Sequence, residues 1–124
     1  MISQPEADAL IAMKKSFINP KMVSLKQGID ETYELIGEDQ KERFFFDLWR
    51  GVLRLSKYKL QTRGRILVVL VRLDINGSPH TNPDGRILDG THLHIYKEGF
   101  GDKWAYPMEP SVFEDISSVG STFR

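Results

Sequence analysis

All three histidines of the chain, His80, His92 and His94, lie in one stretch of nineteen residues, SPHTNPDGRILDGTHLHIY at 78–96. Imidazole is the side chain whose unperturbed pKa lies near neutrality, so histidines can accept and donate protons at physiological pH. Strand alternation places His92 and His94 on one face of HLHIY, about 7 Å apart. We predict that this stretch holds the functional site, with the three histidines as catalytic residues.

A second polar stripe lies upstream, in KYKLQTR at 57–63. If this segment is a regular strand, alternate residues share one face; these are Lys57, Lys59, Gln61 and Arg63. Such cations suit RNA cleavage, in which a base takes the 2′-hydroxyl proton, an acid protonates the leaving 5′-oxygen and a cation stabilises the phosphorane. We predict that the three cations bind phosphate and that Gln61 orients it, without a metal or other cofactor. The prediction requires both stripes to share a face of the sheet.

Other interpretations of these residues stay open. His-x-His on a strand is a chelating pair, and His80, Asp84 or Asp89 could complete a metal site. Alternatively, the two strand histidines lie on a solvated face without a function, and SPHTNPDG only forms tight turns. Long structured loops often hold functional residues, which favours a function here. In a further interpretation the chain is a binding protein without chemistry, whose basic stripe occupies a nucleic acid or a host protein.

Size and composition limit the class of protein. A length of 124 residues predicts one domain, and 40% hydrophobic with 27% charged residues is typical of a globular chain. The absence of cysteine excludes disulfides, thiolate metal ligands and a cysteine nucleophile. The longest apolar run, at 66–71, is too short to span a membrane, and the N-terminus lacks the pattern of a signal peptide. We expect a cytoplasmic protein that does not bind membranes.

The net charge is zero, but the charges are segregated along the chain. Acids dominate between residues 27 and 48, and every charged residue from 48 to 73 is basic. This pattern predicts either pairing between acidic and basic strands across a sheet or a local basic track.

The pattern of elements predicts an α+β fold, with an antiparallel meander of about six to seven short strands after an N-terminal helix. The helix is expected at 5–17, where acids precede bases along the segment. Within a β-rich region at 22–107, strands are expected at 22–27, 31–36, 43–49, 56–63, 65–74, 92–96 and 104–107. Residues 75–91 are expected to form a long loop. The C-terminal segment, 108–124, is expected to be helical or truncated.

Residues 72–107, RLDINGSPHTNPDGRILDGTHLHIYKEGFGDKWAYP, resemble the signature of an uncharacterised family of small bacterial proteins associated with mobile elements and prophages. RFFFDLWRG and KYKLQTR resemble the same family, so the resemblance covers 22–107. Members are expected to continue in a helical tail, from which the ending SSVGSTFR departs. The resemblance implies either a toxin with a cognate antitoxin or a phage-borne protein that acts on a host defence protein.

Two functions follow from these observations. The first is a small metal-independent endoribonuclease of toxin type, with RNA as its substrate and histidines as general acid and base. The second is a non-catalytic binding protein of a mobile element that inhibits a host defence or nucleic-acid-processing factor.

Overall fold

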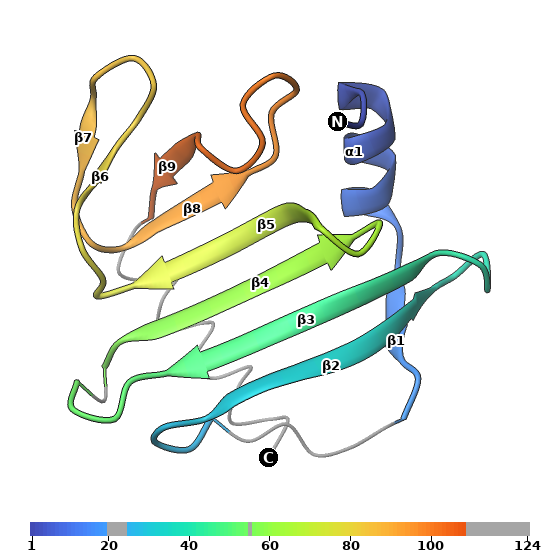
Figure 1. Ribbon diagram of the computed structural model, residues 1–124, viewed down its shortest axis with the longest axis horizontal. Helices are drawn as coiled ribbons and strands as arrows, with labels where there is room; N and C mark the ends of the chain where they lie inside the picture. The colour runs from blue at the N-terminus through green and yellow to red at the C-terminus, as the bar shows by residue number, and fades with distance from the viewer. Residues whose placement is uncertain (20–24, 55, 109–124) are drawn as a thin grey trace.

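The computed structural model describes residues 1–19, 25–54 and 56–108 (Figure 1). Within them, a helix of nine residues, α1 (Gln4–Ala12), precedes a seven-stranded antiparallel sheet. The strands of this sheet are β1 (Lys15–Phe17), β2 (Asp30–Gly37), β3 (Arg43–Arg50), β4 (Tyr58–Gly64), β5 (Val68–Ile75), β8 (His92–Ile95) and β9 (Ala105–Pro107). A separate two-stranded sheet pairs β6 (His80–Thr81) with β7 (Ile87–Leu88). The predicted α+β class, with an N-terminal helix and an antiparallel meander, is confirmed.

The strands of the large sheet follow the order β1-β2-β3-β4-β5-β8-β9, so neighbours in the sheet are also neighbours in the chain apart from the inserted β6–β7 hairpin. Figure 1 shows this hairpin and the short β9 on the same side of β5, above the body of the sheet. Because antiparallel neighbours place opposed residues on the same face, the register sorts the side chains of the whole sheet into two faces.

One face of the sheet forms the apolar core. At one end it packs against α1, and the buried residues of this cluster are Ala7, Leu10, Leu35, Phe44, Leu70 and Tyr96. Further along the same face a second cluster forms beneath residues 25–29, from Leu25, Ile29 and Leu48. The alternation in β3 explains the arrangement, because Phe44 and Leu48 point into the core while Asp47 lies on the opposite face.

The predicted helix at 5–17 is wrong in its second half. The helix begins after Ser3, whose Oγ accepts a hydrogen bond from the Glu6 backbone N–H, and it ends at Ala12. The Lys15 ammonium donates to three backbone carbonyls near this end, those of Leu10, Ile11 and Met13. The backbone of β1 then pairs with the last residues of β2, and this long-range pairing overrides the helical pattern of the local sequence.

Other differences concern segments between the elements. A strand was predicted at 22–27, but residues 20–24 lie outside the described part of the chain and 25–27 belong to no strand. The loop predicted at 75–91 contains the β6–β7 hairpin. The prediction for 108–124 falls almost wholly on 109–124, which lie outside the described residues. No helix in the described part of the chain has the length and apolar character needed to cross a bilayer.

Candidate metal centre and polar sheet face

The side chains of His92 and His94 on β8 and the basic side chains of β4 lie on the same face of the sheet, on either side of β5. Two rows of opposed residues cross β4, β5 and β8, namely Gln61, Arg72 and His94 in one row and Lys59, Asp74 and His92 in the other. Opposed residues of antiparallel strands share a face. The histidines of β8 and the basic stripe therefore share a face of the sheet, as the ribonuclease hypothesis requires. This is the face opposite the apolar core.

The imidazoles of His92 and His94 are buried, each with a residue exposure of 1%. Nδ1 of His92 lies 2.7 Å from the Asp89 carbonyl oxygen, and Nδ1 of His94 lies 2.7 Å from the Asp102 carbonyl oxygen. A carbonyl can only accept, so in both rings Nδ1 carries a proton and donates it. Nε2 of each ring is left to face the interior of the cluster.

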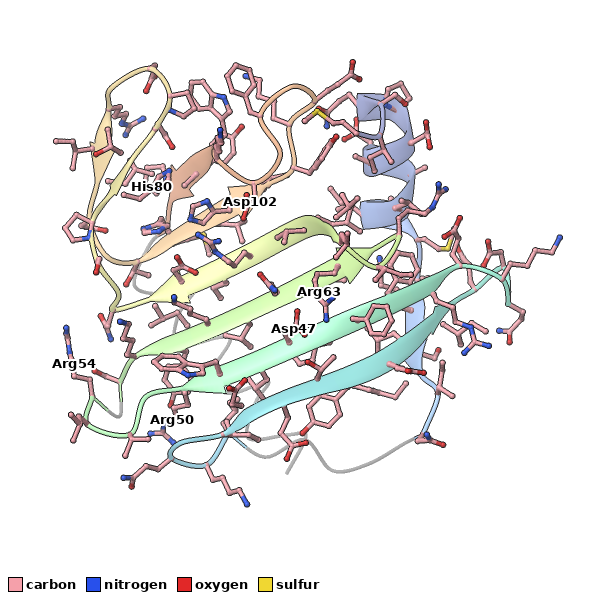
Figure 2. The ribbon with its side chains drawn as sticks, in the orientation of Figure 1. Asp47, Arg50, Arg54, Arg63, His80 and Asp102 are labelled. Atoms are coloured by element: carbon pink, nitrogen blue, oxygen red, sulfur yellow. The ribbon has the colours of Figure 1, made fainter. Side chains whose placement is uncertain are left out.

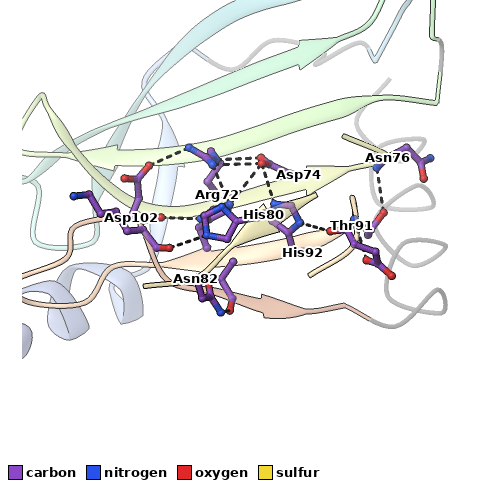
Figure 3. A network of polar contacts seen from close by, with 12 residues as sticks. Arg72, Asp74, Asn76, His80, Asn82, Thr91, His92 and Asp102 are labelled. Carbon is purple, nitrogen blue, oxygen red and sulfur yellow. Dashed lines mark hydrogen bonds and ion pairs between the residues drawn. The ribbon is translucent and has the colours of Figure 1, made fainter. Parts of the chain in front are cut away.

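Both Nε2 atoms meet the carboxylate of Asp74 (Figure 3). The distances to its Oδ2 are 3.3 Å from His92 and 3.6 Å from His94, and the ligand atoms of the three residues lie within 4.8 Å of one another. Two ligands of a tetrahedral ion at 2.0–2.1 Å lie about 3.3 Å apart, so the two nitrogen–oxygen distances are close to the spacing of metal ligands. A histidine ligand whose other nitrogen donates to a backbone carbonyl is also the usual arrangement in metal sites.

Asp74 is a buried anion with cationic support. Burial raises the pKa of this carboxyl, but the contacts of Asp74 with His94 and Arg72, whose guanidinium is charged, outweigh burial and bring the pKa to about 2. Arg72 donates from Nε to Asp74 Oδ1 at 3.1 Å, from Nη1 to Asp102 Oδ2 at 3.0 Å and from Nη2 to His94 Nε2 at 2.9 Å. Its guanidinium therefore uses the lone pair with which His94 would bind a metal, and a metal ion must displace Nη2.

His80 lies against the same two rings but belongs to a different hydrogen-bonding arrangement. Its ring centroid is 4.6 Å from that of His94 and 5.5 Å from that of His92, while its Nε2 donates to the Lys103 carbonyl at 2.8 Å. His80 is outside the group of converging ligand atoms. The amide of Asn82 makes two hydrogen bonds of 2.9 Å with the Ala105 backbone, which fixes the β6–β7 hairpin to β9.

The residues of the predicted basic stripe divide into two pairs. Arg63 donates to Asp47 from Nε at 2.6 Å and from Nη2 at 2.9 Å, and Gln61 donates to the same carboxylate at 2.7 Å. Figure 2 shows the side chains of Arg63 and Asp47 pointing toward each other from β4 and β3. Lys57 and Lys59 have no carboxylate partner among the described residues. That the three cations bind phosphate and Gln61 orients it remains a prediction, with the two lysines as its accessible cations.

A shallow groove lies on this polar face beside the histidine cluster. Its volume is about 300 Å³, and it is lined by Asp30, Asp47, Leu48, Trp49, Lys59, Gln61 and Arg72. Arg72 belongs both to the groove and to the cluster, so the two features adjoin.

Sequence reasoning found the histidines but missed the charged residues that join them. The carboxylate beside His92 and His94 is Asp74, whereas Asp84 and Asp89 are exposed and outside the cluster. A signal was present, because RLD places an arginine and an aspartate two residues apart at the end of an apolar run. Charged side chains on a buried strand require partners, so this pair indicates a polar cluster on β5.

Asp47→Asn is expected to lower the free energy of unfolding by about 1.5–3 kcal/mol at neutral pH, because the carboxylate accepts charged hydrogen bonds. Burial raises the pKa of Asp47, but hydrogen bonds from Arg63, Thr32 and Gln61 lower it further than burial raises it. The folded pKa is below the unfolded value, so this stability is present above the unfolded pKa and is lost as pH falls through the folded pKa. Urea unfolding of both proteins at several pH values measures the effect.

The matched control is Glu34→Gln, which removes a carboxylate from an exposed position of β2 on the same face. It should change the free energy of unfolding by less than about 0.5 kcal/mol. A stability difference between wild type and Asp47→Asn that is equally large at neutral and strongly acidic pH would refute the assignment to ionised Asp47.

The model of a protein family described as a family of unknown function (DUF6978) matches residues 2–124. No curated protein and no solved structure matches the chain.

Proposed function

We propose that this chain, which belongs to the family of unknown function DUF6978, binds one divalent transition-metal ion through Asp74, His92 and His94. The observation that supports the proposal is the convergence of two imidazole Nε2 atoms on one carboxylate oxygen, at 3.3 and 3.6 Å. Two imidazoles and a carboxylate suit zinc and iron(II). Three protein ligands leave at least one coordination position open, as in catalytic rather than structural sites.

Burial favours this function over proton transfer to a polymer. His92 and His94 are each 1% exposed, and their Nε2 atoms face Asp74. A metal ion can enter so small a space once Arg72 Nη2 moves away from His94, whereas a phosphodiester needs a wider opening. The anionic Asp74 also offsets part of the charge of a divalent cation.

The test is isothermal titration of the EDTA-treated, dialysed protein with zinc sulfate. One ion is expected to bind per chain, and His92→Ala or His94→Ala should weaken binding by at least about 100-fold, because each removes one of only three ligands. His80→Ala is the matched control: it deletes an imidazole from the same cluster that is not a ligand, and it should bind zinc like wild type. Circular dichroism checks that each variant is folded. Equal zinc affinity in all four proteins would disprove the proposed site.

The second candidate is the metal-independent endoribonuclease, and one observation favours it. The side chains of Lys59, His92 and His94 lie on the same face of the sheet. In this function His80, His92 and His94 transfer protons. The toxin role implied by the family resemblance, with an antitoxin or host protein as partner, belongs to this candidate.

Incubation of labelled single-stranded RNA with the protein in excess EDTA tests the second candidate. Cleavage by wild type and none by His92→Ala/His94→Ala would support it. Intact RNA with wild type would reject it, and retained RNA binding would then favour the non-catalytic binding protein.

A further inference from the structure

We propose that the groove beside the metal centre binds single-stranded RNA, with one base stacked on Trp49 and the flanking phosphates on Lys57 and Lys59. The part that Arg72 plays in this inference rests on the proposed function. The inference names the substrate class of the proposed metal site. It goes beyond metal binding because Trp49 of β3, Lys59 of β4 and Lys57 just before β4 contact none of the metal ligands in the described hydrogen bonds and ion pairs.

Trp49 supplies an aromatic surface on the polar face of the sheet. It lines the groove from β3, in the same row of opposed residues as Lys59 and Asp74. Stacking of a base on such a ring is tolerant of sequence, because every base has a π-face. Stacking on one ring needs an unpaired base whose face is free, so the geometry favours a single strand over a duplex.

The two lysines make a polynucleotide a better ligand than a mononucleotide. The Nζ atoms of Lys57 and Lys59 lie over the Trp49 ring, 5.7 and 5.9 Å from its centroid, and neither has a carboxylate partner among the described residues. A base that stacks on Trp49 takes the place of these cation–π contacts, and the displaced ammonium groups are then able to meet the phosphates. A base within a strand has one phosphate on each side, whereas a nucleoside monophosphate has one in all. Two unneutralised cations beside one ring match the first arrangement.

Arg72 connects the groove with the metal ligands. It lines the groove, and in the absence of metal its Nη2 donates to His94 Nε2 at 2.9 Å. A metal ion that takes this lone pair leaves Nη2 without that acceptor and able to donate to a phosphate in the groove. The volume of about 300 Å³ is at the lower end for ligand sites and suits one nucleotide at a time. RNA should therefore bind more tightly to the metal-loaded protein.

The test is fluorescence anisotropy of labelled octauridylate with the zinc-loaded full chain. Trp49→Ala should weaken binding about 5- to 100-fold. Lys57→Ala/Lys59→Ala should reduce the slope of log affinity against log salt by about 1.4, because two phosphate contacts are lost.

The controls are Tyr106→Ala, an exposed aromatic on the opposite face, and Lys26→Ala/Lys41→Ala, which removes the same charge from exposed positions. Both controls should bind like wild type.

Each outcome of this experiment separates the two proposals. No binding by zinc-loaded wild type at about 100 μM, binding by Trp49→Ala equal to wild type, or equal affinity for a duplex would overturn the inference, while a normal zinc titration would leave the metal site intact. If the wild type binds RNA but no zinc, and Trp49→Ala loses RNA binding, the groove proposal is supported and the metal site is overturned. The part assigned to Arg72 then falls with the metal site.

Discussion

Asp74→Ala is expected to lower the free energy of unfolding of the metal-free protein by about 3 kcal/mol. The side chain accepts two hydrogen bonds from Arg72, at 3.1 and 3.4 Å, and lies against both buried imidazoles. Removing one partner of a buried charged network costs about 3–5 kcal/mol, because the other partners stay buried without compensation. We expect the lower end of this range, since Arg72 keeps its 3.0 Å contact with Asp102.

Urea unfolding followed by circular dichroism measures this loss. The control Asp8→Ala removes a carboxylate from an exposed position of α1 and should change the free energy of unfolding by less than about 0.5 kcal/mol. If Asp74→Ala were as stable as this control, Asp74 would not be the anion that organises the cluster.

The main strands could be predicted because their side chains alternate with a period of two. RFFFDLW and KYKLQTR correspond closely to β3 and β4, and HLHIY contains β8. The end of the helix could not be predicted, because Lys15–Phe17 continue a helical pattern locally and become a strand only through pairing with residues near the end of β2. Local periodicity holds no information about that distant partner.

For the same reason, only the part of the candidate site that is contiguous in sequence could be predicted. The histidines are close in sequence, so their proximity in space could be expected. Asp74 joins them through the register of β5 against β8, which pairs it with His92 across the inserted hairpin. Arg63 likewise has the residue type of a phosphate ligand, but pairing of β3 with β4 brings it beside Asp47, which sequence spacing does not reveal.

Zinc at a thousand times its dissociation constant is expected to stabilise the folded protein by about 4 kcal/mol, because the ligands converge only in the folded state. For a chain of this size the gain corresponds to a rise in melting temperature of about 10–20 °C. Differential scanning calorimetry with and without zinc measures it. His94→Ala should reduce the gain to about 1.4 kcal/mol or less, as a 100-fold weaker affinity implies. His80→Ala should keep the full rise, because of these two residues only His94 is among the converging ligands.

Arg72→Leu tests the competition between guanidinium and metal, because it should change the two measured quantities in opposite directions. Without zinc the variant should melt at a lower temperature than wild type, since Asp74 loses its ion pair at 3.1 Å. With zinc the rise in melting temperature should exceed that of wild type, because no Nη2 has to be displaced from His94 before the ion binds. A merely structural cluster would show the first change without the second, and a zinc response no larger than that of wild type would contradict the overlap of the two positions.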